Sequence, residues 1–182
     1  MSRARAERRN RSPRHPPGPT PAAEKPRLSD PRRPAAEWGG VVSDNSCIFC
    51  KIAAGSIPAL RVFESPDAIA FLDIAPLAPG HTLLIPRQHF QSILDVPPDV
   101  LGRLSGHLPP LARAVMKVSG ATGLNVLQNT GESSGQAVFH LHFHLIPRTE
   151  EDQLGFRWNA GTYGPGEDKA MQAGLLMALK AQ

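Results

Sequence analysis

The segment Gln136-Ala137-Val138-Phe139-His140-Leu141-His142-Phe143-His144-Leu145-Ile146-Pro147 decides how the chain is interpreted. We expect a strand over 138–146, and side chains alternate between the two faces of a strand. One face then carries three histidines and the other carries leucine and phenylalanine. A solvated strand face usually holds Thr, Lys or Glu, so three alternating histidines indicate a functional site and not merely a polar surface.

The spacing limits what the three histidines do together. At about 3.3 Å per residue, His140 and His144 lie about 13 Å apart along a strand, too far to share one ion with ligand bonds of about 2 Å. At most two of the three bind one metal. The loop 130–136, rich in Gly and Ser, offers backbone N–H groups to a phosphate. A neutral imidazole facing that loop is a natural nucleophile toward phosphorus.

The two cysteines lie three positions apart in Cys47-Ile48-Phe49-Cys50. This count excludes a disulfide framework and leaves half of a metal site, a redox pair or two incidental thiols. A redox pair should follow a strand, whereas the turn-like residues 43–46 precede this one. Half of a zinc site is favoured, and its two missing ligands would have to be histidines.

Hydrophobic patterning predicts an α+β fold: a five-stranded antiparallel sheet with helices packed on one side. Apolar residues spaced like one helix face predict a helix over 97–119, which Pro109-Pro110 must bend or split. His107 should face solvent there. The expected strands are 60–64 and 68–72, joined as a hairpin, then 80–86, 123–129 and 138–146, and a last helix covers 167–180.

The positive charge of the chain is confined to its start. Residues 1–40 hold 10 Lys and Arg, 4 acids and 8 of the 19 prolines, whereas 41–182 hold 10 basic and 12 acidic residues. We therefore expect a disordered basic tail over 1–40 and one domain over 41–182. The tail is interpreted as a solvated extension, or a start codon placed too far upstream, rather than as an arm for nucleic acid, which it would bind only weakly.

The composition also indicates the expected cellular compartment of the protein. Every apolar run is broken long before the ~20 residues that a membrane-spanning helix needs, so no membrane span is expected. No apolar stretch of secretory-signal length follows the first arginines, and a mitochondrial transit peptide should carry fewer prolines. The cytoplasm is the expected compartment.

Four ordered motifs make residues 44–160 similar to the histidine triad hydrolases and transferases. They are the His-x-His-x-His strand after a Gly-Gln pair, Cys47-Ile48-Phe49-Cys50-Lys51-Ile52, Phe71-Leu72-Asp73-Ile74-Ala75-Pro76 and the segment 80–89, Gly-His-Thr-Leu-Leu-Ile-Pro-Arg-Gln-His. The resemblance implies a five-stranded sheet that continues across a homodimer, and a pocket for a nucleoside monophosphate moiety. Histidine at the third triad position resembles the hydrolase branches, because the nucleotidyltransferase branch usually has Gln there.

The resemblance assigns a role to each matching residue. It implies that His142 is the nucleophile, with His144 and His81 contacting the phosphate or holding imidazole orientation. Asn129 and Gln136 would line the phosphate site, and Asp73 would bind ribose unless it merely caps the turn that follows. The purine base would lie against four apolar residues, any of which could equally be core: Phe49, Ile52, Phe71 and Ile74.

Zinc gains its missing ligands from the same resemblance. Members that begin with Cys-Ile-Phe-Cys resemble a zinc-carrying branch, which implies one structural ion per chain held by Cys47, Cys50, His89 and His140. The alternative is that His140 bonds to a neighbouring histidine or to the backbone, with reduced cysteines nearby.

The leading expectation is an enzyme that attacks the α-phosphate of purine nucleoside phosphoramidates through a nucleotidyl-histidine intermediate. A dinucleoside polyphosphate hydrolase is the alternative, because Arg148 could meet a longer anionic leaving group. A nucleotide-binding regulatory protein with incidental turnover is a third possibility. Ala137 stands where phosphoramidase members usually have Ser and the fragile histidine triad branch has Thr, so it chooses between neither branch.

Overall fold

The computed structural model describes residues 43–154 and 160–181, so the predicted tail over 1–40 lies outside the described residues. The elements follow the order α1 (Ile48–Ala53), β1 (Arg61–Glu64), β2 (Ala68–Leu72), β3 (Thr82–Pro86), α2 (Pro98–Gly106), α3 (Leu108–Ser119), β4 (Gly123–Leu127), a short 3-10 turn η2 (Glu132–Ser134), β5 (Phe143–Arg148) and α4 (Glu167–Lys180). No helix of the described residues is long and apolar enough to cross a membrane.

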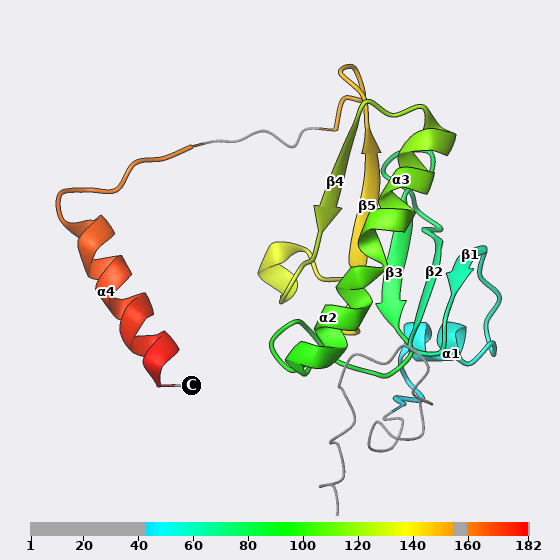
Figure 1. Ribbon diagram of the computed structural model, residues 1–182, viewed down its shortest axis with the longest axis horizontal. Helices are drawn as coiled ribbons and strands as arrows, with labels where there is room; N and C mark the ends of the chain where they lie inside the picture. Colours follow the sequence, from blue (N-terminus) through cyan, green and yellow to red (C-terminus); the bar gives the residue numbers. More distant parts are fainter. Residues whose placement is uncertain (1–42, 155–159, 182) are drawn as a thin grey trace, which may run out of the picture.

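Five antiparallel strands form one sheet in the order β1-β2-β3-β5-β4 (Figure 1). The central strands β2 and β3 are buried on both faces, which is why their sequences are nearly continuous apolar runs. The five predicted strands are confirmed. The last begins at Phe143, so His140 and His142 lie just before β5 and only His144 lies in it.

The two long helices cover one face of the sheet, as expected. Leu104 of α2 and Leu111 of α3 pack with the side chains of that face, including Leu84, Leu141 and Leu145. The short helix α1, which the sequence patterning did not predict, packs on the opposite face against residues such as Ile69 and Leu83. The prediction of helices on one side therefore holds for α2 and α3 but not for α1.

The expected helix 97–119 is two helices separated at His107. The break lies before Pro109 and Pro110, which occupy the first turn of α3, where a missing N–H costs no hydrogen bond. His107 is half-buried and does not face solvent as expected: its ring centroid lies 4.8 Å from that of Phe63, and its Nε2 lies 3.5 Å from Asp67 Oδ1.

The predicted C-terminal helix is confirmed as α4, and none of its residues is buried. It therefore adds nothing to the two apolar clusters that flank the sheet. The candidate site is built instead from α1, the segment that follows β2 and the chain between η2 and β5.

Candidate active site and metal centre

The three triad histidines keep the alternation that the sequence predicts, although only one belongs to a strand. Leu141 and Leu145 are fully buried on the face of the long helices, while His140 and His142 are buried on the face of α1. The backbone N–H of Leu141 donates to the carbonyl of Phe90 at 2.6 Å, which holds this segment extended without sheet pairing.

His142 has a defined tautomer because its hydrogen-bond partner can only accept. Its Nδ1 lies 2.6 Å from the backbone carbonyl of His140, so Nδ1 carries the proton and Nε2 carries the lone pair. Burial lowers the pKa of His142, which keeps the ring neutral. An uncharged imidazole with a free Nε2 lone pair is the form that attacks an electrophile.

His144 and His81 form a second imidazole pair beside His142, whose ring centroid lies 4.8 Å from that of His144. The N–H of Leu77 donates to His81 Nδ1 at 3.1 Å, so the His81 proton is on Nε2. That Nε2 donates to His144 Nδ1 at 2.9 Å. The remaining nitrogen of His144, Nε2, therefore bears a proton that is available to an anion.

Burial keeps this pair neutral too. Desolvation, followed by the neighbouring His142 and His81, lowers the pKa of His144 to about 4. Desolvation also lowers the pKa of His81, although the Asp73 carboxylate opposes the shift. Asp73 Oδ2 lies 3.6 Å from His81 Nδ1, too far for a hydrogen bond.

The expected substrate-binding residues fall into two groups. Phe49, Ile52 and Phe71 are buried in one cluster beside the histidines, whereas Ile74 is fully exposed. Asp73 Oδ1 accepts from the N–H of Ala75 at 2.9 Å, which is the turn-capping role considered above.

Most backbone N–H groups of the loop 130–136 donate to acceptors within the loop itself. Gln136 is buried, its Oε1 accepts from the N–H of Gly131 at 2.8 Å, and its Nε2 donates to the carbonyl of Gln91 at 2.7 Å. The N–H groups of Ser134, Gly135 and Gln136 bond to carbonyls within the loop. The expected nest of free N–H groups is therefore largely occupied, and Gln136 shapes the loop. Asn129 lies at its edge, with Nδ2 3.6 Å from the place of a Cβ on Gly135.

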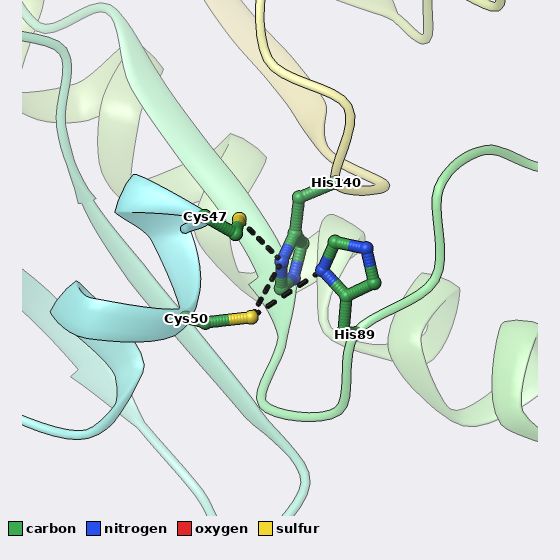
Figure 2. A group of neighbouring side chains, drawn as sticks. All are labelled: Cys47, Cys50, His89 and His140. Carbon is green, nitrogen blue, oxygen red and sulfur yellow. Dashed lines mark hydrogen bonds between the residues drawn. The ribbon is translucent and has the colours of Figure 1, made fainter. Parts of the chain in front are cut away.

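A second cluster, the metal cluster, consists of Cys47, Cys50, His89 and His140 (Figure 2). Cys47 precedes α1, where Asp44 Oδ1 accepts from the N–H of Ser46 at 2.7 Å and starts the turn. The Nε2 of His140 donates to the carbonyl of Pro86 at 3.0 Å, so its Nδ1 lone pair faces the thiols.

The four donor atoms of the metal cluster all lie within 4.8 Å of one another, and three of their distances match those between zinc ligands. His140 Nδ1 lies 3.5 Å from Cys47 Sγ and 3.6 Å from Cys50 Sγ, and His89 Nδ1 lies 3.3 Å from Cys50 Sγ. Ligands of a tetrahedral zinc ion stand roughly 3.3 to 3.8 Å from one another. The four side chains therefore fit zinc. Because they would supply all four ligands of the ion, the site would be of the closed, structural type.

Arg148 does not point to a site. Its guanidinium donates to Asp152, to Asn125 Oδ1 and, at 3.0 Å, to the carbonyl of Leu154. Arg148 is thus bound by groups of its own fold in this structure, and its contact with a long anionic leaving group stays a prediction. Strand patterning does not indicate this pair, because Asp152 lies four residues beyond Arg148, after the strand ends.

Comparison with known proteins identifies close similarities. Residues 54–151 match the HIT domain. An adenylylsulfatase of Arabidopsis thaliana is 38% identical over 77% of this chain and 73% of the relative. An adenosine 5'-monophosphoramidase of Schizosaccharomyces pombe is 40% identical over 69% of this chain and 92% of the relative.

Solved structures agree with the fold. A Zn-bound histidine triad protein of Mycobacterium smegmatis superimposes with a TM-score of 0.58 at 34% identity, covering 75% of this chain and 98% of that one. The similarity to that structure, together with the geometry of the metal cluster, suggests zinc.

Proposed function

The chain belongs to the histidine triad (HIT) family, and we propose that it is a nucleotide hydrolase that cleaves purine nucleoside phosphoramidates, such as adenosine 5'-phosphoramidates, at the α-phosphorus. The observation that carries this proposal is the hydrogen bond from His142 Nδ1 to the carbonyl of His140, because it leaves the Nε2 lone pair of a buried neutral imidazole free to attack. The relatives named adenylylsulfatase and adenosine 5'-monophosphoramidase support the same class of reaction.

In the first step, His142 Nε2 forms a bond to the α-phosphorus while the bond from phosphorus to the leaving nitrogen breaks. The leaving amine departs with that electron pair and takes up a proton from water. In the second step, water attacks the phosphorus and releases a proton to solvent. The electron pair of the breaking phosphorus–nitrogen bond returns to Nε2, and the nucleoside monophosphate is released. One difficult displacement becomes two easier ones.

In this proposal, His144 and His81 stabilise the negative charge that develops on the phosphoryl oxygens. His81 accepts from Leu77 and donates to His144, so the Nε2–H of His144 is the donor that this chain of bonds leaves free. A donor fixed in place before the reaction stabilises a transition state more than one that must reorient. His81 thus acts through His144 as a positioning residue.

The binding assignments are part of the proposal. We assign ribose recognition to Asp73 and the phosphate edge to Asn129, with Gln136 holding the loop in shape. The base would lie at the apolar cluster of Phe49, Ile52 and Phe71, with Ile74 covering it once a nucleotide is bound.

We propose further that the metal cluster holds one structural zinc ion per chain. Zinc would be bound by two thiolates and two neutral imidazoles, and it would tie α1 to the segment that carries the triad. The donor spacing supports this, as does the Zn-bound mycobacterial relative.

We also propose a homodimer in which the sheet continues into that of a second copy. The edge strands β1 and β4 each have one neighbour, and Val126 on β4 is 43% exposed. Such edges are commonly covered in native proteins. The molar mass measured by light scattering after size-exclusion chromatography tests the dimer. A monomer at micromolar concentration would contradict it.

Turnover of an adenosine 5'-phosphoramidate and of a diadenosine polyphosphate, measured beside the affinity for AMP, tests the proposed function. We expect the phosphoramidate to have the higher kcat/KM. Preference for the polyphosphate would favour the second hydrolase class, and tight nucleotide binding with negligible turnover of both would favour a regulatory binding protein.

A further inference from the structure

Phe49 joins the metal cluster to the proposed nucleophile. It stands between Cys47 and Cys50 in the first turn of α1 and is 7% exposed. Its ring meets His142 edge-on, with centroids 5.3 Å apart and planes at 84°, and meets His140 at 5.9 Å and 75°. One aromatic ring therefore touches both a metal-cluster histidine and the nucleophile.

His140 provides a second connection. Its Nδ1 faces the thiols of Cys47 and Cys50, while its backbone carbonyl accepts a hydrogen bond from the Nδ1–H of His142. The same residue thus holds one end of the metal cluster and selects the tautomer of the nucleophile. A shift of residue 140 or of α1 would reach His142 directly.

Among the described residues, the rings that contact the buried imidazole of His142 are those of Phe49 and His144. Besides the carbonyl of His140 and the Phe49 edge, its ring contact is with His144, at a centroid distance of 4.8 Å. If Phe49 withdrew, the ring could rotate away from the carbonyl, and Nε2 would no longer be fixed as the unprotonated nitrogen.

We propose that Phe49 is a positioning residue that transmits occupancy of the metal cluster to His142, holding the nucleophile in its Nδ1–H tautomer. The interpretation of the effect of Phe49 on kcat rests on the proposed hydrolase function. A bound ion would fix α1 relative to residue 140, and the fixed helix would hold the Phe49 ring against the imidazole. The metal cluster then controls the nucleophile as well as supporting the fold.

This role differs from the one that the family resemblance implies for Phe49. A wall of the base pocket contributes to nucleotide affinity, whereas a positioning residue contributes to kcat and to the tautomer of His142. The two roles separate in the KM and kcat of one variant.

The test uses the full-length, metal-loaded protein with ¹⁵N-labelled histidine and the variants Phe49→Leu and Phe63→Leu. Phe63 is the matched control, because its ring packs on the opposite face, 4.8 Å from His107. In Phe49→Leu we expect the His142 ¹⁵N shifts to change from one tautomer to a mixture. We also expect kcat to fall roughly 10- to 100-fold, a larger factor than the loss of AMP affinity that the smaller side chain causes at the apolar cluster. Phe63→Leu should keep the single tautomer and the kcat.

A second arm removes the metal from the wild-type chain with a chelator and records the same ¹⁵N shifts. A mixture of tautomers there supports the proposal whether or not the chain is a hydrolase. The proposal is overturned if Phe49→Leu keeps a single tautomer and a normal kcat while binding AMP more weakly. If Phe49→Leu does not fold, Phe49→Met replaces it and is judged by the same shifts. A folded metal-free chain that keeps a single His142 tautomer also overturns the proposal. If the metal-free chain does not fold, the Phe49 variants decide the positioning role.

Discussion

His81 Nε2 lies 2.9 Å from His144 Nδ1, and the Leu77 N–H that bonds the far nitrogen of His81 fixes the direction of this hydrogen bond. His144 Nδ1 accepts from His81 Nε2 only while the His144 ring is neutral. A proton added to His144 Nδ1 would place two donors face to face and break the pair. The proposed phosphate contact at His144 Nε2 therefore depends on the protonation state of the pair.

The first prediction concerns pH. Burial lowers the pKa of His144 to about 4 and also lowers that of His81. We expect the part of kcat/KM for a phosphoramidate that depends on His144 to be complete at neutral pH and to be lost as the pH falls toward about 4, where His144 gains a proton. A loss of activity centred at the ordinary histidine pKa of about 6.5 would contradict this.

The stability of the folded chain should likewise decrease as the pH is lowered. The folded-state pKa of His144 lies below its unfolded value, so the unfolded chain binds more protons in acid. The contribution of this histidine to folding is therefore complete above about pH 6.5 and is lost as pH falls through about 4. Melting temperatures measured between these values by circular dichroism should decline steadily, and a rise on acidification would oppose the linkage.

The second prediction concerns His81→Phe, which keeps a ring but removes both nitrogens. His144 Nδ1 would lose its donor, and the leftover buried acceptor should cost about 1 to 3 kcal/mol of stability. We expect kcat to fall while the affinity for AMP stays close to that of the wild type, because His81 acts through His144. Steady-state kinetics and AMP titration check it. Weakened AMP binding with unchanged kcat would assign His81 to ground-state binding.

The third prediction concerns metal content. Freshly purified protein should contain about one zinc per chain, and Cys50→Ala should lose it and lower the melting temperature. His107→Gln is the control, because His107 lies outside the metal cluster beside Phe63 and Asp67. Elemental analysis measures both variants. Zinc absent from the wild type, or retained in Cys50→Ala, would refute the ligand set.

The fourth prediction concerns Arg148, which donates to Asp152, Asn125 and the carbonyl of Leu154. Arg148→Gln should lower the melting temperature by a few degrees, because it frees the Asp152 turn. It should leave the ratio of phosphoramidate to diadenosine polyphosphate turnover unchanged. A selective loss of polyphosphate turnover would instead identify Arg148 as a contact for the leaving group.

The sequence predicted the site better than the segments that hold it. The alternation of three histidines follows from extended backbone, which persists before β5 because Leu141 bonds to Phe90. That bond joins residues far apart in the chain, so local patterning extended the strand too far. The sequence predicted a bend or break of this helix at Pro109-Pro110, but the break lies at His107. Prolines are tolerated in the first turn of a helix, so the second helix begins before them.

Other features depend on tertiary contacts that no local pattern reveals. The commitment of Gln136 to the loop and of Arg148 to Asp152 could not be anticipated, since side-chain amides and guanidinium groups bond to whatever the fold brings near. The burial of Phe49 against His142 is of the same kind. The apolar type of Phe49 fitted both a core and a base pocket, and only the fold placed it beside the nucleophile.

The last prediction is that His142 is the nucleophile. Its Nδ1 proton is held by the carbonyl of His140 at 2.6 Å, so the free lone pair is on Nε2, and burial keeps the ring neutral. His142→Ala should abolish turnover and leave AMP affinity largely intact, because affinity would draw on Asp73 and the apolar cluster. His107→Ala, a histidine outside the triad, is the matched control and should retain turnover. Rapid quench of the wild type with a labelled phosphoramidate should trap a nucleotidyl adduct that is labile in acid and stable in base, as phosphorus–nitrogen bonds to histidine are. An active His142→Ala enzyme, or an adduct mapped by mass spectrometry to another residue, would show that a different group attacks the phosphorus.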